Sequence, residues 1–429
     1  MLIIFRRMID QFQKVHLVGA GGIGLSALGK WYLHRGARVT GSDLVSSAQT
    51  DELLESGATI KIGQGIEHVP DDVELLIYSP AVPMDNPERA RARELGAIEM
   101  SYPQALGEMA KQYRTIAVTG THGKSTITAM IGLILETAGL DPTVIVGSKV
   151  YSWPQKNFRA GASNLFVVEA CEHLASFLNI HPDIAVITNI EMDHPDFYRD
   201  LAHVQETFAQ FMSQVKEKVF LGEKDFNLDA PHLEGLSLKI PGEFNVMNAH
   251  CAAAVAKHLG VADEVIVKTL NAFEGLWRRF ERVSVWRGAD IISDYGHHPT
   301  AIVATLKGTR EFFPNRRIVL CFQPHQHSRT KELFNDFVPS FDGADVLVIA
   351  EIYAVSGRLE AEGDVSSEDL VASVKKRDNE KGTVRDIFYA KDLDEAEREL
   401  RDIIQPSDVV LIMGAGDIDD VARRFASYE

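Results

Sequence analysis

Two glycine-rich loops constrain this chain more than any other feature. One lies at residues 19–24 and the other at residues 120–126, and each follows a short β-branched run and precedes a helical stretch. One parallel sheet rarely carries two such loops, so at least two α/β units are expected. Comparable runs, which predict buried parallel strands, occur at 15–18, 75–78, 115–119, 166–168, 184–188, 290–292, 318–322, 346–349 and 409–413.

The length of 429 residues leaves room for two or three domains. A helical stretch at 101–113 leads from the first set of strands to the second glycine loop and predicts one boundary. A basic cluster at 277–282 precedes the third set of strands and predicts another.

Composition excludes several classes of protein. The 44 basic and 61 acidic residues give a net charge of −17, which argues against nonspecific nucleic-acid binding but allows a local anion pocket. The three cysteines are far apart and predict no disulfide framework. We find no apolar stretch of about 18 residues and no signal-peptide core, so we expect a cytoplasmic protein without membrane insertion. Its oligomeric state, monomer or homodimer, stays open.

The first glycine loop, GAGGIG, is typical of diphosphate binding. Glycines let the backbone turn tightly and approach a pyrophosphate, whose charge meets the amides of a helix N-terminus. Asp43, after the next predicted strand, stands where a ribose-binding acid often lies. The pattern does not identify what is attached to the diphosphate, and tight strand-to-helix packing alone would also explain the glycines.

The second loop, GTHGKST, predicts a nucleotide phosphate site. Its backbone amides would surround the phosphates, Lys124 would neutralise charge near the transferred phosphoryl group, and the Ser125 hydroxyl would bind Mg²⁺. Val118 stands where the strict Walker pattern has glycine, so a purely structural Gly-Lys-Ser turn remains an alternative.

Acidic residues follow two further predicted strands. Glu169 ends one, and the segment NIEMDHPD at 189–196 follows the next. Because parallel strands end at the same edge of a sheet, these groups are expected near the metal and the γ-phosphate. Carboxylates suit Mg²⁺, and His194 is a less usual ligand for it. Taken alone, such an acid-rich segment is more often a solvated loop with a helix cap.

Histidines gather in the last third of the chain, at 297, 298, 325 and 327. A zinc site is disfavoured because no thiolates lie at suitable spacing. A Ser-His-Asp hydrolase is disfavoured because no GxSxG elbow follows a strand.

Together these residues resemble the Mur ligases of peptidoglycan synthesis. Five segments carry the resemblance: GAGGIGLS at 19–26, GTHGKST at 120–126, NIEMDHPDFY at 189–198, DYGHHPTAI at 294–302 and FQPHQHSRT at 322–330. The resemblance implies an α/β protein of three domains. These are a Rossmann-like UDP-sugar domain at 1–106, a central ATP-binding domain with a P-loop ATPase-type parallel sheet at 107–279, and a Rossmann-like amino-acid-binding domain at 280–429.

The resemblance also implies the roles of particular residues. Those expected to bind the UDP-sugar are Gly19, Gly21, Gly22, Ile23, Gly24, Asp43, Ser79 and Pro80. Those expected to bind ATP are Gly120, Thr121, His122, Gly123, Lys124, Ser125, Thr126, Asn245, Asn248, Arg279 and Asp294. The metal would be held by Ser125, Glu169 and His194, and the catalytic set would be Lys124, Glu169, His194, Arg279 and Asp294.

His297, His298, His325 and Arg329 would face the amino acid, with Arg329 suited to bind its carboxylate. Many relatives carry a second arginine where this chain has Gln326. The implied reaction joins L-alanine to the lactyl carboxylate of UDP-N-acetylmuramate, with ATP and Mg²⁺, through an acyl phosphate. The alternatives are a ligase that recycles a preformed tripeptide onto the same sugar nucleotide, and a nucleotide-binding regulatory protein without chemistry.

Overall fold

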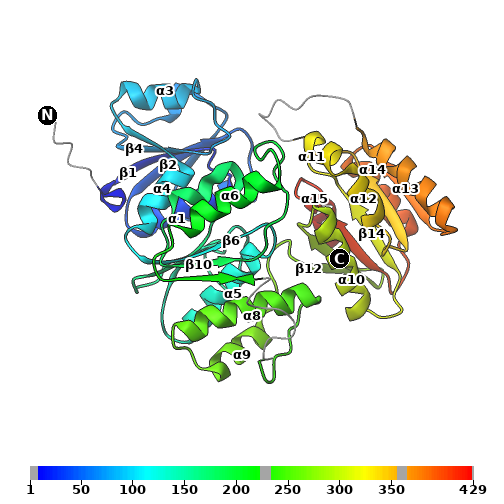
Figure 1. Ribbon diagram of the computed structural model, residues 1–429. Coiled ribbons are helices and arrows are strands. Elements are labelled where there is room, and N and C mark those ends of the chain that lie inside the picture. Colours follow the sequence, from blue (N-terminus) through cyan, green and yellow to red (C-terminus); the bar gives the residue numbers. More distant parts are fainter. Residues whose placement is uncertain (1–7, 223–232, 355–364, 428–429) are drawn as a thin grey trace. The chain divides into compact units, whose positions relative to one another are not determined.

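The computed structural model describes residues 8–222, 233–354 and 365–427. Its described strands form three separate sheets (Figure 1). Two compact units contain them: the first unit holds the first two sheets, and the second holds the third sheet with the segments 191–201 and 236–248. No helix in the described ranges is both long enough and apolar enough to cross a membrane.

The first sheet is fully parallel, with the order β3-β2-β1-β4-β5. Its strands are β1 (Lys14–Val18), β2 (Arg38–Asp43), β3 (Thr59–Ile62), β4 (Leu75–Tyr78) and β5 (Ile98–Ser101). The connecting helices are α1 (Ile23–His34), α2 (Ala48–Glu55), α3 (Pro87–Glu94) and α4 (Tyr102–Ala110). The strand order reverses at β1, so the glycine loop after β1 lies at the switch point, where α/β sheets bind ligands.

Local capping explains where these helices begin. The Ser47 hydroxyl accepts the amide of Thr50 at α2, and Asn86 Oδ1 accepts the amides of Glu88 and Arg89 at α3. Ser101 forms a capping box with Gln104 at α4.

The central sheet has the order β11-β10-β6-β9-β7-β8, and only β8 is antiparallel to its neighbour. Its strands are β6 (Arg114–Thr119), β7 (Thr143–Ile145), β8 (Phe158–Arg159), β9 (Leu165–Glu169), β10 (Ile184–Ile187) and β11 (Lys218–Leu221). The helical segments that accompany it are α5 (Lys124–Thr137), η3 (His173–Asn179), α6 (Leu201–Met212), α8 (Glu243–His258) and α9 (Asp263–Ala272).

A buried ionic cluster, made of Lys30, Glu52, Lys149 and Asn157, ties the first two sheets together. Lys30 Nζ donates to Glu52 Oε2 at 2.7 Å and to Asn157 Oδ1 at 2.7 Å, and Lys149 Nζ donates to Glu52 Oε1 at 2.9 Å. Burial opposes ionisation of Glu52, but the bonds from both lysines lower its pKa to about 2. Removing Glu52 would leave the buried charges of Lys30 and Lys149 without their carboxylate partner, so Glu52 holds α2 firmly against α1 and the segment that follows β7.

The third sheet has the order β12-β13-β17-β14-β15-β16, with β12 antiparallel to β13. Its strands are β12 (Glu281–Trp286), β13 (Ala289–Asp294), β14 (Ile318–Phe322), β15 (Val346–Ala350), β16 (Asp386–Ala390) and β17 (Val409–Met413). Its helices are α10 (Pro299–Phe312), α11 (His327–Glu332), α12 (Phe334–Ser340), α13 (Ser367–Lys381), α14 (Leu393–Ile403) and α15 (Asp419–Ala426).

Two apolar clusters cover the two faces of the third sheet. One packs α10, α12 and α13 against it, and the other packs α14 and α15. The predicted three-part α/β architecture is therefore confirmed. The predicted domain limits stay predictions; the limit at 106/107 falls inside α4, and the limit at 279/280 falls just before β12.

Candidate active site

The first glycine loop runs from the end of β1 to the start of α1. Gly19 has a φ of +82°, and a Cβ built on it would lie 2.9 Å from Cβ of Ser79, so the loop passes directly against the turn after β4. The amides of Gly19 and Ala20 both donate to the carbonyl of Ser42 at 2.9 Å. The predicted neighbours Gly19 and Ser79 are thus brought together, and α1 begins at a glycine N-cap without a side-chain cap.

Asp43, the predicted ribose ligand, closes this loop. Its Oδ2 accepts a hydrogen bond from the amide of Gly21 at 2.7 Å, and its Oδ1 accepts one from the amide of Val45 at 3.3 Å. The Asp43 carboxylate, at the end of β2, therefore helps to fix the backbone conformation of the first glycine loop.

The second glycine loop lies at the carboxyl end of β6. Gly120 has a φ of +127°, and a Cβ there would lie 2.0 Å from Oγ1 of Thr188. The amide of Thr121 donates to the carbonyl of Asn189 at 3.1 Å, and the amide of His122 donates to Asn189 Oδ1 at 2.8 Å. Only glycine fits at position 120, because both the backbone angle and the space exclude a side chain.

Lys124 opens α5, and its ammonium group is held by acceptors of the same unit. Nζ lies 2.9 Å from Oε1 of Glu172 and donates to the carbonyls of Gly120 and Thr121 at 2.5 and 3.1 Å. Burial lowers the pKa of this ammonium, but the negative charge of Glu172 outweighs burial, so the pKa of Lys124 is raised overall. The lysine is therefore charged, and its ammonium lies against the backbone of the loop and Glu172.

Two oxygen groups of the first unit suit a hard cation. Ser125 is buried in the first turn of α5, and Glu169 ends β9, where its Oε2 accepts the amide of Gly147 at 2.7 Å. A hydroxyl and a carboxylate are the donors that Mg²⁺ prefers, so these residues fit that ion. The third predicted ligand, His194, belongs to the second unit, where its Nε2 lies 3.8 Å from Oδ2 of Asp193.

In the second unit, three of the four residues predicted to face the amino acid lie together. Nη1 of Arg329 contacts Nδ1 of His325 at 3.0 Å, and the rings of His297 and His325 are 5.7 Å apart. The ring of His325 also stacks on Tyr353 at 5.5 Å. Nε and Nη2 of Arg329 donate to Oδ1 of Asp193 at 3.0 and 2.8 Å, which makes a buried ion pair.

His297 is held as a neutral imidazole. Burial and the positive charge of Arg329 lower its pKa well below the ordinary value, although Asp193 opposes the shift. Its Nδ1 lies 3.0 Å from the carbonyl of Tyr295. A carbonyl only accepts hydrogen bonds, so Nδ1 carries the proton and Nε2 is left with a lone pair.

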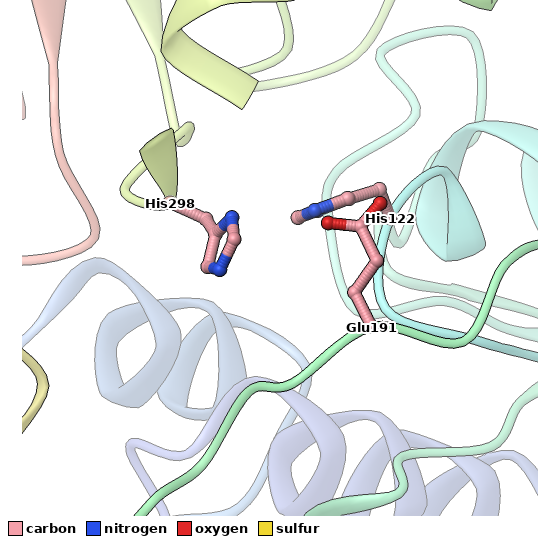
Figure 2. A group of neighbouring side chains, drawn as sticks. All are labelled: His122, Glu191 and His298. Carbon is pink, nitrogen blue, oxygen red and sulfur yellow. The ribbon is translucent and has the colours of Figure 1, made fainter. Parts of the chain in front are cut away.

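His298 has a different structural role from His297. Its Nδ1 accepts the amide of Thr300 at 3.3 Å, so it caps α10. The hydroxyl of Thr300 in turn donates to Oε2 of Glu191 at 3.0 Å. Figure 2 shows the side chains of His298 on the loop before α10 and of Glu191 on the segment after β10.

Four predicted ATP residues also lie in the second unit. Asp294 is half-buried and accepts the amides of Phe280 and Gly296 at 2.8 and 2.7 Å, and desolvation raises its pKa despite these bonds. The guanidinium of Arg279 stacks over the ring of Tyr295 at 4.7 Å. Asn248 donates to Oδ1 of Asn245 at 3.2 Å, and Asn245 donates to the carbonyl of Pro241 at 2.7 Å.

Family models match three consecutive parts of the chain. The Mur ligase family catalytic domain matches residues 14–114, the Mur ligase middle domain matches 118–233, and the glutamate ligase domain of Mur ligases matches 278–416. The chain belongs to the Mur ligase family. Both glycine loops and the histidine cluster fall inside the matched ranges.

This Mur ligase is similar to known proteins over nearly its whole length. The UDP-N-acetylmuramate–L-alanine ligase of Caldanaerobacter subterraneus subsp. tengcongensis is 36% identical over 97% of this chain and 98% of its own. The corresponding enzyme of Geobacter sulfurreducens is also 36% identical, over 96% of each chain.

Solved structures agree with this similarity. The crystal structure of UDP-N-acetylmuramate–alanine ligase MurC from Thermotoga maritima has a TM-score of 0.82 and 27% identity, over 97% of this chain and 98% of that one. The murein peptide ligase of Psychrobacter arcticus shares the fold, with a TM-score of 0.68 and 21% identity.

Two acidic residues of the site were not singled out from the sequence, although Asp193 lies in the segment 189–196 that was expected near the metal and the γ-phosphate. Glu172 follows Glu169 by three positions, beyond the same strand end, and that spacing was a usable signal. Asp193 lies in the segment after β10, but nothing in its position along the chain indicated a bond to Arg329.

Proposed function

We propose that this Mur ligase joins L-alanine to the lactyl carboxylate of UDP-N-acetylmuramate at the expense of ATP. The observation that carries the proposal is its full-length similarity to relatives named for that reaction. Two glycine loops in one compact unit support it, because the reaction needs one site for a sugar diphosphate and another for a triphosphate.

The chemistry requires activation of a poor electrophile. A carboxylate oxygen attacks the γ-phosphorus of ATP, ADP leaves, and an acyl phosphate forms. Lys124 would offset the negative charge that spreads over the moving phosphoryl group. Ser125 and Glu169 would hold Mg²⁺, which supplies further charge neutralisation at the phosphate oxygens when it is bound.

The second step forms the amide bond. The nitrogen of the amino acid attacks the acyl carbon, inorganic phosphate leaves, and the nitrogen loses a proton. We assign His297 to accept that proton, because its Nε2 has a lone pair and its neutral form dominates near pH 7. His325 and Tyr353 border the same group.

Recognition of the amino-acid carboxylate would involve Arg329. Its Nε and Nη2 are bound to Asp193, and its Nη1 lies against His325, so an incoming carboxylate has to compete with Asp193 or bind through Nη1.

A direct assay tests the proposal. Phosphate release from ATP is measured with UDP-N-acetylmuramate and Mg²⁺ in the presence of L-alanine, glycine, L-serine or a cell-wall tripeptide, and the product is identified by mass spectrometry. The expected result is release that depends on both the sugar nucleotide and L-alanine. Preference for the tripeptide would favour a recycling ligase, and absence of any amide product would favour a binding protein.

A further inference from the structure

Tyr102 is the first residue of α4, a helix that lies between the first and central sheets of the first unit. α4 packs against α1 on the side of the first sheet and against η3 on the side of the central sheet. The approach to η3 is close, because a Cβ on Gly107 would lie 2.2 Å from the carbonyl oxygen of Asn179. The start of α4 is therefore fixed relative to both sheets.

The phenol of Tyr102 lies against the first glycine loop. A Cβ built on Gly24 would be 2.4 Å from the hydroxyl oxygen and 2.5 Å from Cζ of Tyr102. Gly24 has no left-handed backbone angle, so its lack of a side chain is required by the ring of Tyr102 rather than by the backbone. The hydroxyl thus sits beside the turn that begins α1.

The same phenol is near the strand end that carries Glu169. Burial raises the pKa of Tyr102, and the charges of Glu169 and Cys171 raise it further. The hydroxyl therefore keeps its proton at neutral pH and acts as a donor. Within residues 8–222, 233–354 and 365–427 it has no hydrogen-bond acceptor, and the side chain is partly exposed.

These contacts place a donor beside the first glycine loop, on a helix that also packs against η3 of the central sheet. If the diphosphate binds at the first glycine loop and the lactyl carboxylate reaches Lys124, the sugar connects these two points, and Tyr102 borders the first of them. Resting on the proposed function, we infer that the Tyr102 hydroxyl donates a hydrogen bond to the N-acetylmuramate part of the sugar nucleotide. Tyr102 is then a substrate-binding residue that selects the sugar and leaves the UDP portion to the glycine loop.

The test compares two ligands on the full-length protein. Calorimetric affinities for UDP and for UDP-N-acetylmuramate are measured for the wild type, for Tyr102→Phe and for Tyr113→Phe. The control Tyr113 accepts a hydrogen bond from Trp31 Nε1 at 3.3 Å in the same unit. Phenylalanine keeps the ring against Gly24, so Tyr102→Phe should melt within a few degrees of the wild type.

We expect Tyr102→Phe to weaken UDP-N-acetylmuramate binding about three- to ten-fold, as for one hydrogen bond, with UDP affinity unchanged. The KM for the sugar nucleotide should rise by the same factor while the KM for ATP stays constant. Tyr113→Phe should change neither affinity.

Two results for Tyr102→Phe would overturn this inference but not the proposed function. One is an equal loss of affinity for UDP and UDP-N-acetylmuramate, which would indicate a distorted loop, and the other is unchanged affinity for both ligands. Failure of the wild type to bind UDP-N-acetylmuramate would overturn the proposed function as well, so the two failures are distinguishable.

Discussion

Arg329 donates two hydrogen bonds to a single carboxylate oxygen of Asp193, 136 residues away along the chain. Both side chains are buried, and Nη1 of the same arginine contacts His325. Because a buried charge is costly without a partner, this pair fixes the segment after β10 to α11 within the second unit. The residue expected to bind a substrate carboxylate is therefore already positioned by a carboxylate of the protein.

Replacing Asp193 by alanine should destabilise the second unit strongly. The change leaves the Arg329 guanidinium buried without its partner, which costs about 3–5 kcal/mol in comparable buried pairs. Urea unfolding monitored by fluorescence measures the change in free energy. The control is Glu217→Ala, which breaks the half-exposed ion pair with Arg114 and should cost about 0–1 kcal/mol. Equal losses for the two variants would contradict the structural importance of the buried pair.

The contribution of Asp193 should depend on pH. Burial raises the pKa of this carboxyl, but the charges of His194 and Arg329 outweigh it and hold the pKa well below its ordinary value. A carboxyl with a depressed folded-state pKa stabilises the fold above its unfolded pKa of about 4 and loses that effect as pH falls towards the folded value. The difference in unfolding free energy between wild type and Asp193→Asn should therefore be constant from pH 6 to 8 and shrink below about pH 4. A difference that grows on acidification would reverse the assigned sign.

Replacing Lys124 by methionine should strongly slow phosphoryl transfer while leaving the affinity for the sugar nucleotide unchanged. Removal of one donor to a developing charge typically lowers kcat by about 10²–10³. Steady-state phosphate release measures the effect, and calorimetry with UDP-N-acetylmuramate provides the control. Glu172→Gln keeps the lysine and removes only its charged partner, so its loss in kcat should be smaller. A Glu172→Gln defect as large as that of Lys124→Met would indicate that Glu172 itself takes part in the reaction.

His297→Asn and His298→Asn should separate the two neighbouring histidines. Loss of the proton acceptor lowers amide formation by about 10²-fold or more, while the acyl phosphate still forms and can be trapped with hydroxylamine. Asparagine is a good helix N-cap and can replace His298 at α10, so that variant should retain most activity. If His298→Asn lost as much amide formation as His297→Asn, the assignment of the proton acceptor would be wrong.

Most strands in the middle of the sheets could be predicted from sequence, although the short interior strand β7 was missed, and several strands at the edges could not. β14 and β17 are continuous apolar runs that are buried throughout, and β1 and β4 are mostly apolar and buried; the predicted limits of all four agree closely with the structure. The edge strands β3, β5, β11 and β12 carry exposed residues and lack that pattern. Because an edge strand is identified by its pairing partner, no local run of residues indicates it.

In the candidate site, too, features set by a local motif could be predicted, and contacts between distant elements could not. Lys124 and Ser125 were predictable because a glycine loop between a strand and a helix has a direct physical reason to bind phosphate. The bond from Arg329 to Asp193 and the contact of Tyr102 with Gly24 join residues of distant elements, and only the fold brings them together.

The buried ionic cluster of Lys30, Glu52, Lys149 and Asn157 has one more consequence. By fixing α1 and α2 to the segment after β7, it keeps the two glycine loops of the first unit at a constant separation. Under the proposed function, a sugar nucleotide with a shorter link between its diphosphate and its carboxylate would bind the first loop, but its carboxylate would not reach the γ-phosphate at the second loop. Under the proposed function, sugar nucleotides would therefore be selected by the length of this connection as well as by direct contacts.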